Sequence, residues 1–389
     1  MRALEGITVV TLEHAVAAPL CTRHMADHGA RVIKVERPGT GDFARGYDTR
    51  VRGMSSHFVW TNRSKESVTL NLKSDGGQEV LRRLLGQADV LVQNLAPGAA
   101  QRMGLGYADL QEAHPRLIVC NISGYGPDGS DAARKAYDLL IQAEAGFLSV
   151  TGEGERMAKA GISVADIAAG MYAYSSILAA LIARGRTGVG AQIDISMLEA
   201  LAEWMGYPMY YAFDGAAPPA RAGAAHATIF PYGPFATGDG GQVMLGLQNE
   251  REWRRFCSDV LSRPELTEDP RFATNAARAG HQDALRDIIE TGFAEMTAGD
   301  VVRMLEAAGI ATARINDMAG LWAHPQLEAR ARWTEVGSPA GRVPALLPPG
   351  LTEARMDPIP ALGADTETVL QELGYNAAEI ATLRDRDAI

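Results

Sequence analysis

The sequence predicts an α/β protein with a large Rossmann-like domain of parallel sheet and helices, followed by a smaller α+β domain. Residues 1–125 alternate short runs rich in Val, Ile and Leu with helix-like segments, which is typical of buried parallel strands. Near residues 214–225 the composition shifts to Gly, Ala and Pro, and a new set of strand-like and helix-like segments follows. With 389 residues and 47% hydrophobic content, the chain can bury more than one core.

The N-terminal part supplies the sheet. We expect strands at Ile7–Leu12, Arg31–Glu36, Ser67–Leu72, Asp89–Asn94 and Leu117–Ile122, and helices at Pro19–His28, Gly76–Gln87 and Tyr107–Ala113. Pro19 suits the first position of its helix, where a missing N–H costs nothing. The segment between the first strand and this helix, residues 13–19, contains no glycine, so the tight phosphate turn of dinucleotide-binding proteins is absent.

The remaining elements divide the chain further. Helices are expected at 162–184, 196–204, 249–261, 282–295 and 298–308, strands at Gln192–Ile195 and Gly241–Leu247, and one or two helices at Asp365–Leu383. We therefore place the first part of the large domain at 1–213, a linker at 214–225, the small domain at 226–316, a linker or crossing at 317–363, and the C-terminal helices at 364–389. Residues 335–363 are rich in Pro and Gly and show little periodicity.

Charge and cysteine usage limit the possible partners. A formal net charge of −10 argues against a nucleic-acid or acidic-membrane partner. The three cysteines are far apart and lack metal-type spacing, so we expect no metal site and a reducing, cytoplasmic environment. The N-terminus lacks a signal-peptide pattern, and the apolar region 167–183 is interrupted by small and polar residues, as in a helix of a globular protein.

Asp166 is the most informative residue. It is the one carboxylate in the small, apolar stretch 161–171. Two interpretations stay open on the residues alone: Asp166 caps the first turn of a helix, or it is a covalent nucleophile.

Cationic and polar residues follow several predicted strands. Arg37 and Lys73 come directly after their strands, and Asn94 ends a strand that leads to Arg102. Ligands of open parallel sheets bind beyond the carboxyl ends of the strands, and Arg suits phosphate groups. Solvent-facing helix termini would explain any one of these residues equally well.

Several ordered motifs carry a family resemblance. The chain resembles the class III CoA-transferases, the family of formyl-CoA transferase and the carnitine CoA-transferases, over nearly its whole length. The matching runs include AAPLCT at 17–22, GARVIKVERPGTGD at 29–42, NRSK at 62–65, QNLAPG at 93–98, RMGLGY at 102–107, SGYGP at 123–127 and TGVGAQIDIS at 187–196.

The resemblance implies a fold and a set of site residues. The C-terminal helices would complete the large domain, and two subunits would interlock as a homodimer. Asp166 matches the family's nucleophilic aspartate. The positions implied to bind CoA are Ala15, Val16, Ala17, Arg37, Lys73, Asn94, Arg102, Met103 and Lys135, the first three at the acyl end. Val16 stands where some members have Gln, so one hydrogen bond to the oxyanion is missing or supplied by another group.

The implied activity is transfer of CoA from an acyl-CoA thioester to a free carboxylic acid, through an anhydride and a thioester on Asp166. Coenzyme A is then a substrate, and no tightly bound cofactor is expected. Supporting roles fall to Asp138, Tyr137, His226 and His14, and Arg45 or His226 would hold the distal carboxylate of a small dicarboxylic acid. The candidate acids are succinate, malate, citramalate, itaconate and mesaconate.

Two alternatives remain. Acyl-CoA racemases of the same superfamily place His before the aspartate equivalent to Asp138, whereas this chain has Tyr137, a poor base at neutral pH. A non-catalytic CoA-binding protein is the other alternative, and the presence of Asp166 counts against it.

Overall fold

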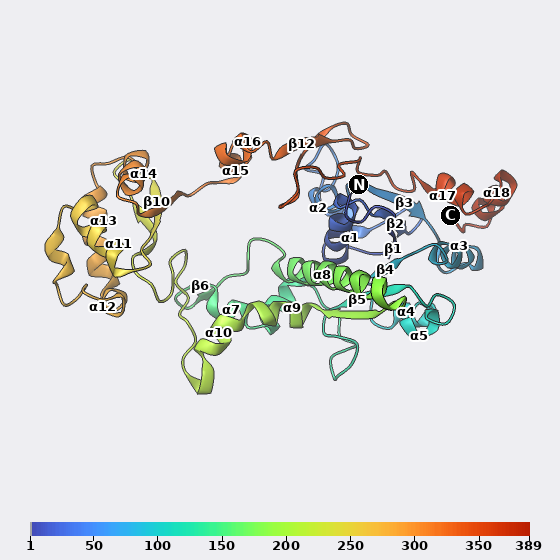
Figure 1. Cartoon of the computed structure of the whole chain (residues 1–389), viewed down its shortest axis with the longest axis horizontal. Coiled ribbons are helices and arrows are strands. Elements are labelled where there is room, and N and C mark those ends of the chain that lie inside the picture. Colours follow the sequence, from blue (N-terminus) through green and yellow to red (C-terminus); the bar gives the residue numbers. More distant parts are fainter. Residues whose placement is uncertain (1) are drawn as a thin grey trace. The chain divides into compact units, whose positions relative to one another are not determined.

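The computed structural model describes residues 2–389, which form two units. The first unit combines the chain up to Gly146 with Ala160–Gly206 and Leu327–Ile389. The second combines Phe147–Lys159 with Tyr207–Gln326. Both chain ends therefore belong to the first unit, as the blue and red ribbons show (Figure 1). The short segment 147–159, which the sequence places in the large domain, belongs to the second unit.

A six-stranded parallel sheet forms the centre of the first unit, which confirms the predicted fold class. The strands are β1 (Thr8–Leu12), β2 (Arg31–Glu36), β3 (Lys65–Thr69), β4 (Val90–Gln93), β5 (Ile118–Ser123) and β8 (Gln192–Ser196). Their order is β3-β2-β1-β4-β5-β8, and every neighbouring pair is parallel. The order reverses between β1 and β4, so the crevice of such a sheet opens beyond the carboxyl ends of these two strands.

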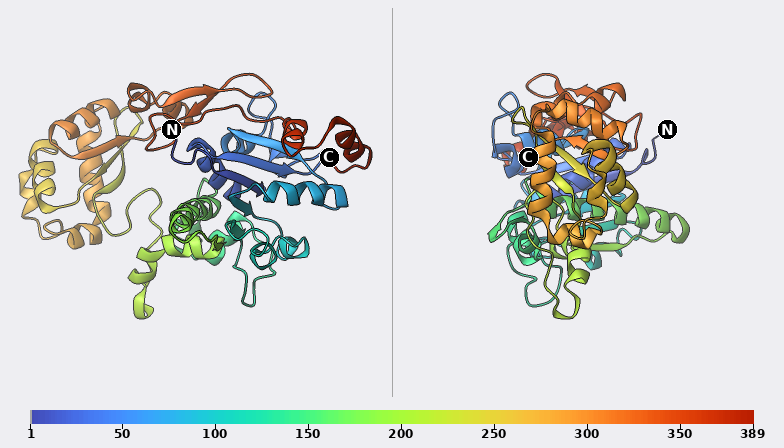
Figure 2. Two further views of the ribbon diagram at one scale, coloured as in Figure 1. Left: turned by 45° about the vertical axis from the view of Figure 1, so that its right-hand side comes forward. Right: turned by 90° about the vertical axis from the view of Figure 1, so that its left-hand side faces the viewer.

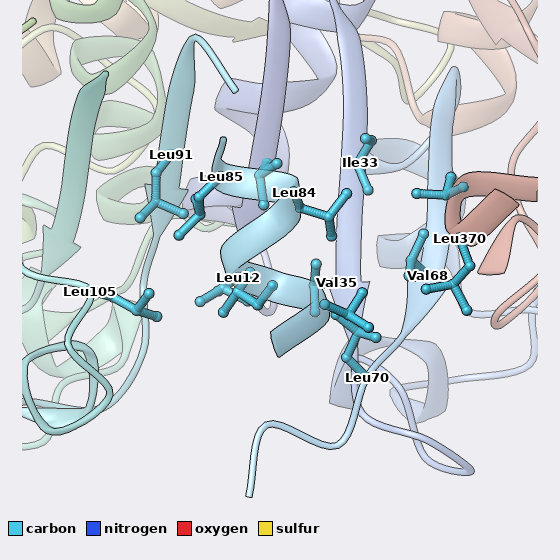
Figure 3. Close-up of a cluster of buried hydrophobic side chains, with 14 of the residues drawn as sticks. Leu12, Ile33, Val35, Val68, Leu70, Leu84, Leu85, Leu91, Leu105 and Leu370 are labelled. Atoms are coloured by element: carbon cyan, nitrogen blue, oxygen red, sulfur yellow. The ribbon is translucent and has the colours of Figure 1, made fainter. Parts of the chain in front are cut away.

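The two faces of the sheet differ in chemistry. Alternate residues of a strand point to opposite faces, and on β2 Ile33 and Val35 join an apolar cluster with Leu12, Leu84 and Leu91 (Figure 3). Lys34 lies between these two residues in sequence and Glu36 follows Val35, and both are also fully or almost fully buried. One face therefore holds the apolar core, and the other holds buried charges.

Helices cover both faces of this sheet. They are α1 (Ala17–Asp27), α2 (Ser56–Thr61), α3 (Asp75–Leu85), α4 (Ala99–Arg102), α5 (Tyr107–Leu110), α6 (Asp138–Glu144), α8 (Val164–Thr187), α9 (Met197–Trp204), α17 (Thr366–Glu372) and α18 (Ala377–Asp385). Pro19 is the third residue of α1, not the first as predicted. Its missing N–H is still harmless, because the first four N–H groups of a helix have no partner within it.

The C-terminal helices pack beside the N-terminal strands, as Figure 2 also shows. The Asp365 carboxylate accepts a hydrogen bond from the Ser67 backbone N–H at 2.8 Å. The Thr366 hydroxyl accepts one from the Thr69 backbone N–H at 3.0 Å. These contacts join the end of the chain to the edge strand β3.

α8 is the longest described helix, with 24 residues. It packs along α1 and also contacts β5 and β8. Gly170 permits this approach, because a Cβ there would lie 2.6 Å from the carbonyl oxygen of Ala17. Among the described residues, α8 is the one helix whose length and apolar composition would suit a membrane span. Length and composition alone are weak evidence for a span, since a core helix also meets both criteria.

The second unit has its own sheet and core. An antiparallel sheet of order β11-β10-β9 comprises β9 (Tyr232–Ala236), β10 (Gln242–Gly246) and β11 (Ala311–Arg314). The helices are α7 (Phe147–Val150), α10 (Gly206–Tyr211), α11 (Glu250–Arg255), α12 (Asn275–Gly280), α13 (Gln282–Phe293) and α14 (Ala298–Ala307), with a short hairpin of β6 (Gly152–Glu153) and β7 (Arg156–Met157). Phe235, Trp253 and Phe293 are fully or almost fully buried in the core of this unit.

Two expectations for the middle of the chain need correction. The helix expected at 249–261 ends as α-helix at Arg255 and continues as a π turn over Phe256–Val260. The segment 317–363, expected as a linker, contains α15 (Met318–Trp322), α16 (Pro325–Ala329) and a hairpin of β12 (Trp333–Val336) and β13 (Val343–Leu346). Pro344 lies within β13, which is possible because a two-stranded hairpin consists of edge strands.

Candidate active site at the start of α8

Asp166 lies in the first turn of α8, half-buried, near the carboxyl end of β1. The backbone N–H of Ala17, the first residue of α1, lies close enough to its carboxylate to act on its pKa. Burial raises the pKa of Asp166 to about 7, the nearby Asp138 carboxylate adds to this rise, and the Ala17 N–H partly opposes it. The ordinary value near ~3.9 therefore does not describe this group, and near neutral pH both protonation states are populated.

Asp138 performs the capping that the sequence assigned to Asp166 as one interpretation. Ser163, the N-cap residue of α8, makes no side-chain capping bond. Oδ1 of Asp138 accepts hydrogen bonds from the backbone N–H groups of Ala165 at 2.8 Å and Asp166 at 3.3 Å. Oδ2 accepts from Gln142 at 2.6 Å. Because Asp138 caps the helix from α6, the carboxylate of Asp166 is not needed as a cap.

The loop between β1 and α1 is held from two sides. The side-chain oxygen of Asn94 accepts from the His14 backbone N–H at 2.8 Å, and its amide nitrogen donates to the His14 carbonyl at 2.9 Å. The Asp42 carboxylate accepts from the Ala15 backbone N–H at 3.1 Å. Ala15 has a φ of +61°, a left-handed conformation that is uncommon for a residue other than Gly.

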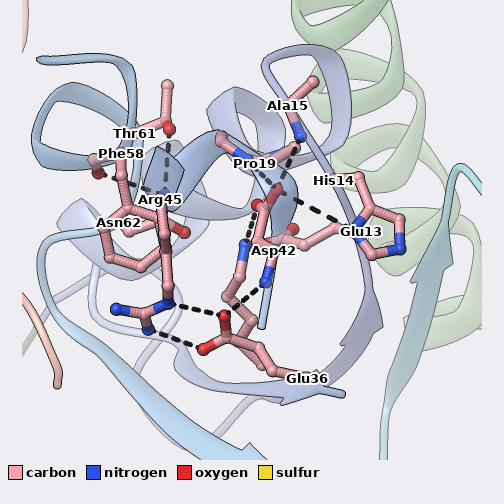
Figure 4. Close-up of polar contacts among 12 residues, drawn as sticks. Glu13, His14, Ala15, Pro19, Glu36, Asp42, Arg45, Phe58, Thr61 and Asn62 are labelled. Carbon is pink, nitrogen blue, oxygen red and sulfur yellow. Dashed lines mark hydrogen bonds and ion pairs between the residues drawn. The ribbon is translucent and has the colours of Figure 1, made fainter. Parts of the chain in front are cut away.

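A network of buried charges lies behind this loop (Figure 4). Lys34 donates to Asp42 at 2.7 Å and to Glu13 at 3.3 Å, and Lys65 donates to Glu13 at 2.6 Å. Burial favours the neutral form of Glu13, yet Lys65 and Lys34 together lower its pKa to about 2. All four side chains are fully or almost fully buried, so each charge is paired where water is absent.

Arg45 is also part of this network and is not open to a substrate. Its guanidinium donates to both carboxylate oxygens of Glu36, at 2.8 and 2.7 Å, and to the Pro360 carbonyl at 3.3 Å. It also lies over the Phe58 ring, 3.8 Å from the centroid. These contacts occupy all three of its nitrogens, so the structure does not favour the expected role of holding a distal carboxylate.

Aromatic side chains surround the same region. The His14 ring stacks on Phe43 at 5.1 Å, and its Nδ1 lies 3.8 Å from Oδ1 of Asp42. Tyr47 packs against Phe43, and burial followed by the charges of Asp42 and Asp166 raises the pKa of Tyr47 to about 12. Tyr137 precedes Asp138 and is 67% exposed. The Tyr137 phenol is therefore open to solvent.

The predicted CoA-binding residues divide into two groups. Arg37, Lys73, Arg102 and Lys135 are exposed, and none of them forms a salt bridge with any residue between 2 and 389. Most other arginines in this unit, among them Arg31 and Arg63, are paired with carboxylates. Exposed, unpaired cations at strand ends suit an anionic ligand.

The other predicted CoA-binding residues are engaged within the protein. Val16 and Ala17 are buried at the start of α1, Asn94 holds the His14 backbone, and Met103 packs against the core of the sheet. Val16 offers no side-chain capping bond to α1. The donor at this end of α1 is therefore the backbone N–H of Ala17.

His226 belongs to the second unit. Its Nδ1 accepts hydrogen bonds from the backbone N–H groups of Thr228 and Ile229, both at 3.1 Å, and the ring stacks on Tyr232. A ring nitrogen that accepts twice carries no proton, so the proton of the neutral ring is on Nε2. His226 therefore closes a turn and presents one N–H donor.

The sequence analysis missed the buried charges Glu13, Lys34 and Asp42. One signal was present, because Lys34 interrupts the apolar strand Val32–Glu36 at a position that alternation places opposite Ile33 and Val35. A lysine at a buried strand position requires a buried acid, but the sequence does not say which one. Among residues 2–389, no group of His, Cys, Asp or Glu is arranged to hold a metal ion.

Comparisons with known proteins show the family to which the chain is similar. The sequence profile described as CoA-transferase family III matches residues 4–366. The chain is 33% identical to the succinyl-CoA:glutarate CoA-transferase of Homo sapiens, covering 98% of this chain and 89% of the relative. It is 36% identical to the succinate–glutarate CoA-transferase of Agrobacterium fabrum, with 95% of each covered. Its fold is similar to the crystal structure of a CAIB/BAIF family protein from Brucella suis, with a TM-score of 0.84, 33% identity, and 96% and 99% of the two chains covered.

Proposed function

The chain belongs to CoA-transferase family III, and from this premise we propose that it moves coenzyme A from an acyl-CoA thioester to a small dicarboxylic acid through covalent intermediates on Asp166. The observation that carries the proposal is the environment of Asp166. This carboxylate is half-buried, is not needed as the cap of its own helix, and lies close to the backbone N–H of Ala17.

The proposed reaction begins with the ionised Asp166 carboxylate. One of its oxygens attacks the carbonyl carbon of the donor thioester, the C–S bond breaks, and a mixed anhydride and CoA thiolate result. The thiolate then attacks the carbonyl carbon of Asp166, and the donor acid leaves as a carboxylate. The enzyme is left as an aspartyl-CoA thioester.

The acceptor acid then repeats these two steps in reverse order. Its carboxylate attacks the aspartyl carbonyl and displaces the thiolate, which forms a second anhydride. The thiolate attacks the acceptor's acyl carbon and frees Asp166 as a carboxylate. Every intermediate remains activated, so the thioester is conserved as long as water does not reach the anhydride.

Negative charge develops on an oxygen in each of these steps. The Ala17 N–H lies close enough to the Asp166 carboxylate to act on its pKa, and a backbone donor so placed can stabilise the oxyanion formed when that carbonyl is attacked. This donor supplies a contact that Val16, in place of a glutamine, does not offer. The raised pKa of Asp166 makes its carboxylate a better nucleophile than an ordinary, more weakly basic aspartate, at the expense of its ionised fraction.

The exposed cations without a carboxylate partner are our candidates for binding coenzyme A itself. Arg37 directly follows β2, Lys73 lies in the loop after β3, and Arg102 ends α4, the helix after β4, so all three belong to segments that leave the carboxyl ends of neighbouring strands. Their charges suit the phosphate groups of CoA, in an otherwise acidic protein. We assign the cluster as a whole to the phosphates and adenine end.

The substrate class rests on the relatives. Both relatives named above exchange CoA between succinate and glutarate, according to their names. We therefore propose succinyl-CoA as donor and a four- or five-carbon dicarboxylic acid as acceptor, with glutarate added to the acids considered from the sequence. Because Arg45 is engaged with Glu36, the distal carboxylate requires other donors, and the Nε2–H of His226 is our candidate.

We also propose that the active molecule is a homodimer. Large apolar side chains are exposed along residues 204–213, including Tyr210 at 81%, Phe213 at 73% and Trp204 at 47%. Exposure of so many aromatic side chains to water in one short segment is unfavourable. We therefore infer that a second subunit covers residues 204–213.

A transfer assay tests the proposed function. Wild-type protein with succinyl-CoA and glutarate should form glutaryl-CoA, and Asp166→Ala should abolish transfer while retaining CoA binding. Asp109→Ala, which removes an exposed carboxylate of α5, is the matched control and should retain activity. Transfer by Asp166→Ala within tenfold of wild type would remove Asp166 from the mechanism.

The same protein should be tested for racemase activity. A 2-methyl-branched acyl-CoA incubated in D2O should show no exchange of the α-proton, because Tyr137 replaces the histidine base expected of racemases. Fast exchange without CoA transfer would favour the racemase over the transferase.

A further inference from the structure

Asp42 does not contact the candidate nucleophile Asp166, and its side chain is not exposed to solvent. It is completely buried, at the end of the loop that follows β2. Its backbone N–H donates to Oε1 of Glu36 at 3.0 Å. Gly41 precedes it with a φ of +66°, and a Cβ there would lie 2.9 Å from the same Glu36 oxygen. The conformation of this loop therefore places the Asp42 carboxylate in the interior of the unit.

The two oxygens of Asp42 have different partners. Oδ2 accepts from the buried Lys34 ammonium at 2.7 Å. Oδ1 accepts from two backbone N–H groups, of Ala15 at 3.1 Å and of Ala44 at 2.9 Å. Burial opposes ionisation of Asp42, but the charge of Lys34, the nearby His14 ring and the hydrogen bonds from Lys34 and Ala44 hold its pKa well below the ordinary value. Asp42 is therefore a fixed anion.

Ala15 needs such a restraint. Its left-handed conformation is unfavourable for a side chain with a Cβ, and left free it would return to the extended or right-handed region. Asn94 holds the carbonyl and N–H of the preceding residue, His14, whereas Asp42 holds the N–H of Ala15 itself. The hydrogen bonds of Asn94 and Asp42 together fix the direction in which the backbone enters α1.

The N–H that acts on Asp166 follows two residues later. Ala17 is the first residue of α1, its carbonyl oxygen lies against Gly170 of α8, four residues after Asp166, and its N–H is close enough to act on the Asp166 carboxylate. We propose that Asp42 is a positioning residue of the active site: its buried carboxylate holds Ala15 in the left-handed conformation and so aims the Ala17 N–H at Asp166. This inference rests on the proposed function of Asp166.

The test compares Asp42→Asn with wild type by kinetics and by titration of Asp166. Asn keeps an oxygen for the Ala15 N–H but loses the charge that pairs with Lys34, so the restraint weakens without a change of size. We expect at least a tenfold fall in kcat with a KM for the acyl-CoA within threefold of wild type. We also expect the pKa of Asp166, followed by carbon NMR of a labelled carboxylate, to rise, because the Ala17 N–H is displaced. Asp138 and Tyr47, the other ionisable groups whose charges interact with Asp166, are unchanged in this variant.

A pair of variants at Ala15 tests the conformation without disturbing the buried charges. Gly can keep a positive φ, whereas the β-branched Val cannot adopt it without strain. Ala15→Gly should therefore retain at least tenfold more kcat than Ala15→Val, and Ala15→Val should raise the pKa of Asp166. If Asp42→Asn does not fold, the comparison of Ala15→Gly with Ala15→Val still tests whether the left-handed conformation of Ala15 controls Asp166.

The outcomes separate this inference from the proposed function. Failure of wild type to transfer CoA would overturn the function, and the NMR titrations would still decide whether Asp42 and Ala15 control the Asp166 environment. A folded Asp42→Asn with wild-type kcat and an unchanged Asp166 pKa would overturn the inference, as would equal kcat in Ala15→Gly and Ala15→Val. A fall in CoA affinity alone, with kcat and the pKa unchanged, would show a merely structural role and also overturn it.

Discussion

At the scale of single residues, the ionisation of Asp166 controls the proposed reaction. Only the carboxylate is nucleophilic, and its pKa is raised to about 7 by burial and then by Asp138. The ionised fraction therefore increases as the pH rises through 7, so kcat/KM should increase with pH and level off above the pKa. We expect roughly tenfold lower kcat/KM at pH 6 than at pH 8, which follows from a single ionisation near 7.

The measurement is a pH profile of kcat/KM with succinyl-CoA and a fixed acceptor, between pH 5.5 and 8.5. Stability should be followed over the same range, so that acid unfolding is not mistaken for protonation of Asp166. A flat profile down to pH 5.5 would mean that the carboxylate keeps the low pKa of an exposed aspartate.

Arg37 and Arg102 give a second prediction at this scale. Arg37 follows β2 directly and Arg102 ends α4, and both are exposed with no carboxylate partner among the described residues. Replacing either with Ala should weaken CoA binding by about 1.5–3 kcal/mol, the value of a charge-assisted hydrogen bond. Titration calorimetry with CoA would measure this loss, and higher salt should reduce the difference between the variants and wild type.

Arg82→Ala is the matched control for these variants. Arg82 is equally exposed in the same unit, on α3, and is paired with Glu79 at 3.2 Å. It should bind CoA as wild type does. If Arg37→Ala and Arg102→Ala also bind like wild type, these cations are ordinary solvated surface.

At the scale of elements, the start of α8 depends on a cap from α6. Asp138 accepts from the N–H groups of Ala165 and Asp166 while its charge raises the pKa of Asp166. Asp138→Ala should lose about 1–2 kcal/mol of unfolding free energy, the usual effect of removing a helix cap. Asp138→Asn keeps an acceptor oxygen and should lose less.

Asp138→Ala and Asp138→Asn should have the same effect on the pH profile of kcat/KM. Both remove the negative charge next to Asp166, so the midpoint of the kcat/KM profile should move to lower pH in each. Urea denaturation and the pH profile together separate the cap from the charge. Equal stability of Asp138→Ala and wild type would contradict the capping role, and an unmoved profile in both variants would contradict the electrostatic one.

The sequence predicted regular elements better than irregular ones. The strands of the parallel sheet are runs of buried apolar residues, and α8 and α13 have clear helical composition, so all were predicted near their observed positions. β9 was missed because Gly233 and Pro234 break a strand pattern. The structure tolerates them because β9 is an edge strand of its sheet, a fact of topology that the local sequence does not contain.

The candidate site likewise has features that the local sequence indicates and features that it does not. Asp166 and the cations were singled out as candidates from the sequence, the first from its isolation in an apolar stretch and the others from their position after predicted strands, and their roles stay predictions. The pKa of Asp166 and the engagement of Arg45 with Glu36 could not be predicted, because both depend on groups that only the tertiary fold brings together. Arg45 and Glu36 are nine residues apart, and Asp138 and Asp166 are 28 apart.

At the scale of the whole molecule, the interlocked homodimer remains a prediction. The exposed aromatic side chains along residues 204–213 support a partner surface, and the family resemblance implies two threaded subunits. Subunits threaded through each other cannot separate without extensive unfolding, so exchange should be extremely slow. Dimers carrying two different tags should be mixed under native conditions and analysed by mass over several days. Rapid formation of mixed-tag dimers, or a stable active monomer in sedimentation, would contradict the interlocked arrangement.

The central claim is that Asp166 carries the acyl and CoA groups in turn, and chemical trapping tests it most directly. Wild-type enzyme should be incubated with succinyl-CoA, quenched with hydroxylamine, digested and analysed by mass spectrometry, with Asp166→Ala treated in parallel. We predict a hydroxamate at Asp166 in the wild type, dependent on succinyl-CoA, and none elsewhere in either protein. Efficient CoA transfer with no modification at Asp166, or with the hydroxamate on another residue, would contradict the account.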